Sequence, residues 1–465
     1  MKKIKNYIAG ILTTPYNSNY INNFNPATGE VYTMTPDSFE GDLYLATESA
    51  EKALPVWSNT PVEDRCNLML WIADKIRKNS DKLALAECND TGKPLWLIKS
   101  IDIPAAIKNL EYFASSAKYF ASKSKSPSLQ PYGFVGAISS MNLPLFSLTW
   151  KIVPALTTGN CVIVNPPVLS PMTACLFSEL CIEAGLPDGV LCVLHGFVNK
   201  IGTAIVTNPK IETITFSGSA QTSSQITYES ASKKIMLELG GKNPCIVFKD
   251  CNYNKMLESI IYSSYSNHGE NNLGCSKIFI EKSLYEKFKK DFVEKAKNLK
   301  VGDPLENDTH VGAIVSKEYL DKVLLYIKSV KEEGAKILCG GSKAKIDILK
   351  SARIKNGLFF EPTVIEELNP NCELSKEDVL GPVVVLYTFD TEDDLAQLVS
   401  ENKSGFASTI WTEDLKKAQR VATKLNTRII WVNSWMLTEL NTPYNGKEEM
   451  NLESGVNKAL KFFLQ

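Results

Sequence analysis

The chain has 465 residues, of which 44% are hydrophobic and 22% charged, and its formal net charge is −1. This length allows two or three domains with substantial cores. The near-zero charge argues against nucleic-acid or anionic-membrane binding driven by bulk charge, and no run of about 18 apolar residues predicts a membrane span.

The 11 cysteines are an odd number, scattered singly, with no Cys-x-x-Cys pair. This pattern predicts neither a disulfide framework nor a metal site. Reduced thiols and an ordinary globular composition indicate a cytoplasmic protein. The basic start, Met1 to Lys5, is followed by an apolar run that is too short for a signal peptide.

Periodicity and turn residues predict helices and strands that alternate along the first half of the chain. Helices are expected over 42–57, 61–78 and on to about residue 120, followed by a loop over 121–131. Strands are expected over 133–139, 161–164, 189–194 and 211–216, with a helix capped by Ser170 between the second and third. Such alternation predicts a doubly wound parallel sheet, and therefore an α/β fold.

A second α/β region lies after residue 243. Strands are expected over 244–248, 278–280 and 429–432. Helices are expected up to residue 266, from residue 283, over 317–334 and over 412–425. Ser283 followed by Glu286 is the pattern of a capping box, in which each side chain bonds the other residue's backbone N–H.

Two segments carry a resemblance to a known family. The segment from Leu237 to Lys242 and the segment from Asn267 to Lys277 resemble the signature sequences of the NAD(P)-dependent aldehyde dehydrogenases. The resemblance is near full length, from the turn at residues 25–29 to Phe462-Phe463. Residues 431–435 and 439–443 are similar to the 2-aminomuconic semialdehyde dehydrogenase branch of that family.

The resemblance implies an architecture. It implies a Rossmann-like cofactor-binding domain over 1–115 and 132–243 and an α/β catalytic domain over 244–434. A small oligomerisation β-segment is expected over 116–131 and 435–465. The implied substrate is a small aldehyde and the implied cofactor is NAD.

The resemblance also assigns residues to the family's chemistry, in which a thiolate attacks the aldehyde, an oxyanion is stabilised and a carboxylate activates water. Asn142 matches the oxyanion asparagine, Lys151 the active-site lysine and Glu238 the general base. Counting 34 residues from Glu238, or five from Asn267, places the nucleophile at residue 272, which is asparagine. A carboxamide is not a nucleophile at neutral pH.

Cys275 is the nearest thiol to that position. Three residues separate two Cα atoms by roughly 5 Å along a helix or roughly 10 Å in an extended chain. Because attack requires approach to about 3–3.5 Å, Cys275 is expected to be out of reach unless the loop is rebuilt.

The cofactor side is altered as well. Gly218-Ser219 resembles the family's pyrophosphate seat at a helix N-terminus. Asn165 and Val168 stand where the family has the lysine and glutamate that hold the adenosine ribose. Asp378 and Leu380 replace a longer acid and an aromatic ring at the nicotinamide ribose. NAD is therefore the expected cofactor, with weakened binding.

Glu111 stands where the branch has an arginine for the substrate carboxylate.

These residues leave three hypotheses. The favoured one is a catalytically inactive or strongly impaired homologue, acting as a binding or structural protein, as a homo-oligomer or with an active paralogue. The second is an active NAD-dependent aldehyde oxidoreductase that uses Cys275 or another route. The third is a cofactor-free, esterase-like activity of Glu238 and Asn142.

Overall fold

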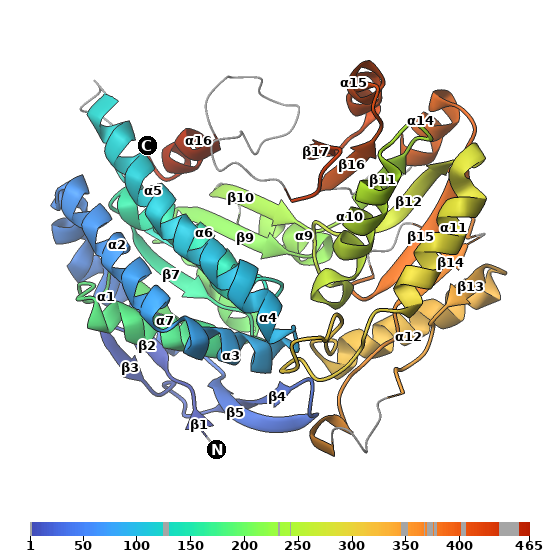
Figure 1. Ribbon diagram of the computed structural model, residues 1–465. Coiled ribbons are helices and arrows are strands. Elements are labelled where there is room, and N and C mark those ends of the chain that lie inside the picture. The colour runs from blue at the N-terminus through green and yellow to red at the C-terminus, as the bar shows by residue number, and fades with distance from the viewer. Residues whose placement is uncertain are drawn as a thin grey trace.

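The computed structural model describes residues 2–123, 130–230, 233–241, 243–345, 352–366, 368–369, 375, 379–400, 406–436 and 455–465. Two seven-stranded sheets and one three-stranded sheet organise these residues. Figure 1 shows the two large sheets in separate halves of the molecule, each with helices packed against it. The predicted alternation of strands and helices is confirmed, and the fold is α/β as expected.

The first large sheet has the order β10-β9-β6-β7-β8-β2-β3. Its strands are β2 (Asn6–Ile8), β3 (Ile11–Thr13), β6 (Phe134–Ile138), β7 (Cys161–Asn165), β8 (Leu191–Val193), β9 (Thr213–Gly218) and β10 (Lys234–Leu239). The five strands β6 to β10 pair in parallel, and β2 is antiparallel to both β8 and β3. Every residue of β7 is buried, as expected for a strand covered on both faces.

Helices cover both faces of this sheet. One face packs against α1 (Glu40–Asn59), α8 (Thr203–Thr207) and α9 (Ala220–Glu229). The other packs against α2 (Val62–Lys78), α3 (Ser80–Thr91), α5 (Ile103–Lys123), α6 (Pro144–Thr157) and α7 (Met172–Glu183). A short helix α4 (Leu95–Leu97) and a π-helical turn (Ile98–Asp102) lead into α5. This arrangement is the doubly wound sheet that the sequence predicted.

The second large sheet has the order β13-β14-β15-β12-β11-β16-β17. Its strands are β11 (Asn243–Val247), β12 (Cys275–Glu281), β13 (Lys336–Cys339), β14 (Thr363–Glu366), β15 (Val383–Phe389), β16 (Ala407–Trp411) and β17 (Ile429–Val432). α10 (Tyr253–Tyr265) and α11 (Lys282–Lys297) cover one face. α12 (Lys317–Glu332), α14 (Glu392–Ser400) and α15 (Leu415–Lys424) cover the other.

The smallest sheet consists of β1 (Lys2–Lys3), β5 (Glu30–Pro36) and β4 (Tyr20–Asn25). Helix α16 (Gly455–Phe462) ends the chain, and Leu464 bridges to Pro131. Most of the predicted oligomerisation segment, residues 124–129 and 437–454, lies outside the described residues.

Three local predictions were wrong. The capping box at Ser283 does not form, because α11 already begins at Lys282 with Glu281 at its N-cap. Helix α7 begins at Met172 with Pro171 at its N-cap, so Ser170 does not cap it. Helix α5 extends to Lys123, beyond the predicted start of the loop. In each case the end of the helix lies one to three residues from the predicted position, because local sequence patterns define helix ends only approximately.

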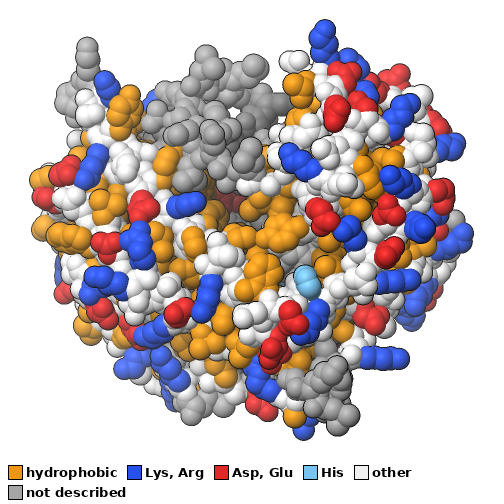
Figure 2. Space-filling view, in the orientation of Figure 1, with side chains coloured by type: hydrophobic (Ala, Val, Ile, Leu, Met, Phe, Trp, Pro, Cys, Tyr) orange, Lys and Arg blue, Asp and Glu red, His pale blue; other side chains and the backbone are white. Residues whose placement is uncertain are grey.

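The surface carries charges of both signs. Figure 2 shows Lys, Arg, Asp and Glu side chains interspersed over the outer parts of one face and hydrophobic side chains gathered nearer its centre. Along the described ranges, no helix combines the length and apolar character needed to cross a bilayer.

Candidate active site

Glu238 lies near the end of edge strand β10 and receives three hydrogen bonds. The Trp150 indole Nε1 donates to its Oε1 at 2.6 Å. The Lys151 Nζ and the Ser217 Oγ donate to its Oε2 at 2.9 and 2.7 Å. Trp150 and Lys151 come from the buried helix α6, and Ser217 pairs with Glu238 across β9 and β10. Two sheet strands and one helix therefore fix this carboxylate.

The charge of Glu238 is balanced locally. Burial alone favours its neutral form, but the Lys151 ammonium and the hydrogen bonds hold the pKa of Glu238 below its usual range. Burial also lowers the pKa of Lys151, and the adjacent carboxylate opposes that shift. The lowered pKa keeps Glu238 ionised, and its three donors occupy acceptor positions that a water would otherwise use.

Asn142 lies in the turn before α6, and the turn is fixed through its backbone. The Asn142 carbonyl accepts hydrogen bonds from the Lys93 Nζ at 2.9 Å and from the Asn267 Nδ2 at 3.2 Å. The Leu145 N–H donates to the Glu87 carboxyl. The Asn142 carboxamide is half-buried and makes no hydrogen bond to a described residue. Its N–H donors are therefore available to water or to a ligand.

Three buried ionisable groups support this turn, and sequence reasoning missed them. Lys93 forms an ion pair with Asp102, and Glu87 is fully buried beside them. Burial and the nearby Asp102 raise the pKa of Glu87 well above its usual range. Charged residues are rarely fully buried unless paired, so this cluster has a specific structural task. Its only sequence signal is the Thr91-to-Pro94 segment, where a lysine stands between a glycine and a proline.

The segment before the expected nucleophile has an unusual backbone. Asn267, His268 and Gly269 have successive φ values of 53°, 42° and 73°, in the left-handed region. Gly269 is required by packing as well, because a Cβ there would lie 2.1 Å from the Gly381 carbonyl oxygen. The His268 Nε2 lies 3.0 Å from the Glu270 carboxylate. Non-glycine residues in this region cost energy and persist only where the surroundings hold them.

Asn272 lies in the turn that comes next. The Gly274 N–H donates to the Asn271 carbonyl, which places Asn272 and Leu273 at the centre of a tight turn. The Asn243 Nδ2 donates to the Asn272 carbonyl at 2.7 Å and to the Gly274 carbonyl at 3.0 Å. The Asn272 side chain is half-buried and has no hydrogen bond to a described residue. Asn243 thus anchors the turn to the second sheet.

Cys275 lies on strand β12, which begins three residues earlier than the sequence predicted. Its side chain is only 3% exposed and packs in the core beneath α10 and α11. The Cys275 sulfur contacts the Thr409 hydroxyl at 3.6 Å. A hydrogen bond from Cys245 lowers the pKa of Cys275, and burial opposes that shift. The thiol is therefore polarised but enclosed by core side chains, and a nucleophile also needs access to its substrate.

The expected cofactor seat is altered at its ribose position. The Asn165 Nδ2 donates to the backbone carbonyls of Leu194 and Gly196 at 2.9 and 3.2 Å, and the residue is 2% exposed. Its amide hydrogens are thus committed to the protein itself. Val168 is half-buried and offers no acceptor. These two residues do not fit a ribose that needs a cation and a hydroxyl acceptor.

The expected pyrophosphate seat is preserved as a strand-to-helix turn. β9 ends at Gly218, and Ser219 caps α9 by accepting a hydrogen bond from the Thr222 N–H at 3.2 Å. Leu380 is half-buried next to Gly381, which packs on the Asn267-to-Gly274 loop. Asp378 lies outside the described residues.

The structure brings some of the predicted site residues into contact and keeps others apart. Lys151 and Glu238 form an ion pair, and the turn of Asn142 is hydrogen-bonded to the loop that leads to Asn272. Cys275 instead faces a hydrophobic core. Glu111 is on the exposed part of α5, where it pairs with Arg77.

Comparison with known proteins gives one consistent result. A sequence model described as "Aldehyde dehydrogenase family" matches residues 13–465. Human 2-aminomuconic semialdehyde dehydrogenase is 36% identical over 460 residues, covering 96% of this chain and 94% of that protein. The 5-carboxymethyl-2-hydroxymuconate semialdehyde dehydrogenase of Escherichia coli is 34% identical over 454 residues, covering 96% of each chain.

Solved structures agree with these sequence matches. The HpcC protein of Thermus thermophilus superposes with a TM-score of 0.94 at 30% identity, covering 100% of this chain and 92% of that one. An NAD+ complex of an aldehyde dehydrogenase from Bacillus cereus superposes with a TM-score of 0.91 at 29% identity, covering 100% of this chain and 95% of that one.

Proposed function

The chain belongs to the aldehyde dehydrogenase family, and from that premise we propose that it is a member whose dehydrogenase activity is lost or strongly impaired. NAD is the cofactor expected for this family. The ancestral reaction is the NAD-dependent oxidation of a semialdehyde to a carboxylic acid, as the names of the relatives suggest.

The observation that carries the proposal is the identity of residue 272. An asparagine occupies the position to which both spacings assign the nucleophile, and its turn is anchored by Asn243 rather than rebuilt around a thiol. Removing the nucleophile of a comparable covalent mechanism lowers turnover by about 10⁶-fold. Cys275 does not offset that loss, because its sulfur is buried in the core of the second sheet.

Two further features support the same proposal. Three protein donors bind the Glu238 carboxylate, so an attacking water would compete with them for its oxygens. The ribose position lacks the lysine cation, and Val168 has no side-chain acceptor, so each lost hydrogen bond weakens binding by about 1 kcal/mol. We therefore infer that NAD binds weakly, and that the chain acts through binding or assembly, alone or with an active paralogue.

The test is an assay of the purified full-length protein with a muconic-type semialdehyde and NAD. We expect no reduction of nicotinamide above background. A second measurement monitors the melting temperature with and without millimolar NAD, since a ligand of the native state raises stability by RT ln(1 + [L]/Kd). We expect almost no shift for the wild type, and a larger shift for the double variant Asn165→Lys/Val168→Glu.

Two results would overturn the proposal. Nicotinamide reduction that disappears in Cys275→Ala would establish Cys275 as the nucleophile of an active dehydrogenase. Cofactor-free ester hydrolysis that disappears in Glu238→Gln but persists in Cys275→Ala would establish the esterase-like activity.

A further inference from the structure

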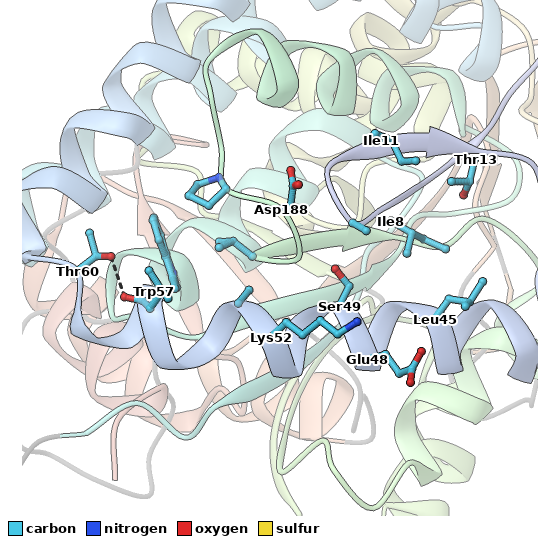
Figure 3. Close-up of a pocket in the computed structure, with 15 residues that line it drawn as sticks. Ile8, Ile11, Thr13, Leu45, Glu48, Ser49, Lys52, Trp57, Thr60 and Asp188 are labelled. Carbon is cyan, nitrogen blue, oxygen red and sulfur yellow. Dashed lines mark hydrogen bonds between the residues drawn. The ribbon is translucent and has the colours of Figure 1, made fainter.

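A cavity separate from the candidate active site opens beside helix α1. Its volume is about 620 Å³, within the range of small-molecule sites. Figure 3 shows its three walls: α1 with Ser49 and Lys52, the β2–β3 hairpin with Ile8 and Ile11, and the segment that carries Asp188. The cavity shares no residue with the Glu238 and Asn142 site, so binding there does not depend on the proposed function.

Close backbone packing fixes the walls. Gly10 has a φ of 76° in the turn of the β2–β3 hairpin, and a Cβ there would lie 1.7 Å from the Asp188 carboxylate. The hairpin therefore lies directly against the Asp188 side chain. A Cβ on Gly189 would lie 2.4 Å from the Ser49 carbonyl oxygen, so the Asp188 segment also lies directly on α1. The cavity is thus bounded by elements that are in contact with one another.

The interior and lip of the cavity are mainly apolar. Ile11, Leu45 and Val56 line it and remain 61%, 40% and 71% exposed. Large apolar side chains gathered around one concavity are typical of a binding site. Trp57 also lines the cavity, and its buried Nε1 has no hydrogen-bond partner among the described residues. The Trp57 ring adds an aromatic, apolar surface to the lining, which suits the apolar part of a ligand.

Opposite charges stand on opposite walls. Figure 3 shows Lys52 on α1 and Asp188 on the facing segment. Both side chains are exposed, and neither forms an ion pair with a described residue. The remaining acid of the lining, Glu48, accepts a hydrogen bond from the Tyr44 hydroxyl at 2.9 Å. The mouth of the cavity therefore presents the Lys52 ammonium and the Asp188 carboxylate on facing walls, with the hydrogen-bonded Glu48 carboxylate on the same helix as Lys52.

We propose that this cavity binds a small α-amino acid with an apolar side chain, in its zwitterionic form. The ligand's carboxylate faces Lys52, its ammonium faces Asp188, and its side chain covers the apolar surface near Trp57. A simple carboxylate would satisfy Lys52 but face Asp188, and a simple amine would satisfy Asp188 but face Lys52. The cavity thus selects for a ligand that carries both charges.

The test is titration calorimetry of the full-length protein with L-phenylalanine, with phenylpropanoate and phenethylamine as the analogues that lack one charge. We expect saturable binding of L-phenylalanine, and about fivefold weaker binding of each analogue, the size of one exposed ion pair. The variants Lys52→Gln and Asp188→Asn should each weaken L-phenylalanine binding by about fivefold. The matched control Lys108→Gln, an exposed lysine on α5, should leave it unchanged.

Three outcomes would overturn the proposal. These are no binding of L-phenylalanine at millimolar concentration, equal binding of the zwitterion and both analogues, and unchanged binding in both charge variants. Unchanged melting temperatures of Lys52→Gln and Asp188→Asn would show that each variant is folded. Tryptophan fluorescence supplies a second readout, because any change on binding should disappear in Trp57→Phe.

Discussion

The Lys151 Nζ lies 2.9 Å from the Glu238 Oε2, and this ion pair joins helix α6 to the edge strand of the first sheet. The Lys151 side chain is fully buried, whereas that of Glu238 is 17% exposed. Neutralising Glu238 would leave a buried ammonium without its counter-charge. The pair therefore fixes the positions of both residues and also stabilises the folded protein.

We expect Glu238→Gln to lower the free energy of unfolding by about 3 kcal/mol, because the Lys151 charge would remain buried and unpaired. The exposed pair of Glu318 and Lys322 on α12 supplies the control, and Glu318→Gln should cost less than about 0.5 kcal/mol. Urea unfolding of the three proteins measures both differences. Equal losses in the two variants would contradict this stabilising role of Glu238.

Restoring the thiol alone should recover little activity. In Asn272→Cys the new sulfur would still lack a tightly bound NAD, because the ribose contacts are missing, so we expect only a small increase in aldehyde oxidation. The assay compares this variant with Asn272→Ser, which has the same loop without a thiol. Turnover in Asn272→Cys at the level of an active relative would show that the cofactor site is intact.

The Cys275 thiol should be protected in the folded protein. It is 3% exposed, whereas Cys251 is half-buried. We expect iodoacetamide to modify Cys251 well before Cys275 in native protein, and both thiols at similar rates in urea, because access limits the reaction. Peptide mass spectrometry at timed intervals measures each rate. Rapid native alkylation of Cys275 would favour the second hypothesis, an enzyme that uses this thiol.

Buried His195 should make stability fall in acid. Burial lowers its pKa to about 3, while the unfolded chain has a histidine pKa of about 6.5. Between these pH values His195 is protonated in the unfolded state but neutral in the folded state. The free energy of unfolding therefore falls by about 1.4 kcal/mol per pH unit as pH decreases. The stability of wild type relative to His195→Leu should therefore drop by about 2–3 kcal/mol from pH 6.5 to about pH 4.5.

Asp90 supplies a control of opposite sign. Burial raises its pKa to about 7, against hydrogen bonds that favour the carboxylate. The folded state keeps a proton that the unfolded state has released, so stability contributed by Asp90 is lost as pH rises between about 4 and 7. The stability of wild type relative to Asp90→Asn should fall with increasing pH. If the stability difference changed in the same direction with pH for His195→Leu and for Asp90→Asn, the opposite pKa shifts assigned to His195 and Asp90 would be contradicted.

The alternating α/β order could be predicted from the amino-acid sequence alone, because buried parallel strands are short apolar runs and their helices are separated by turn residues. The signature spacings also predicted that Glu238, Asn142 and Lys151 share one site with Asn272, and the structure joins Lys151 to Glu238 directly. Helix ends such as the start of α11 were misplaced, because a capping pattern in the sequence locates a helix end only to within one or two residues.

Only the tertiary structure decides which residues each side chain contacts. Glu238 and Lys151 are 87 residues apart, and the strand and helix that carry them meet only in the fold. Sequence spacing predicted only how far Cys275 lies from Asn272 along the chain. The fold decides that the Cys275 sulfur is buried in the core of the second sheet. The cluster of Lys93, Asp102 and Glu87 had almost no sequence signal. Its charges are tolerated because packing places them together, and packing is a property of the folded chain.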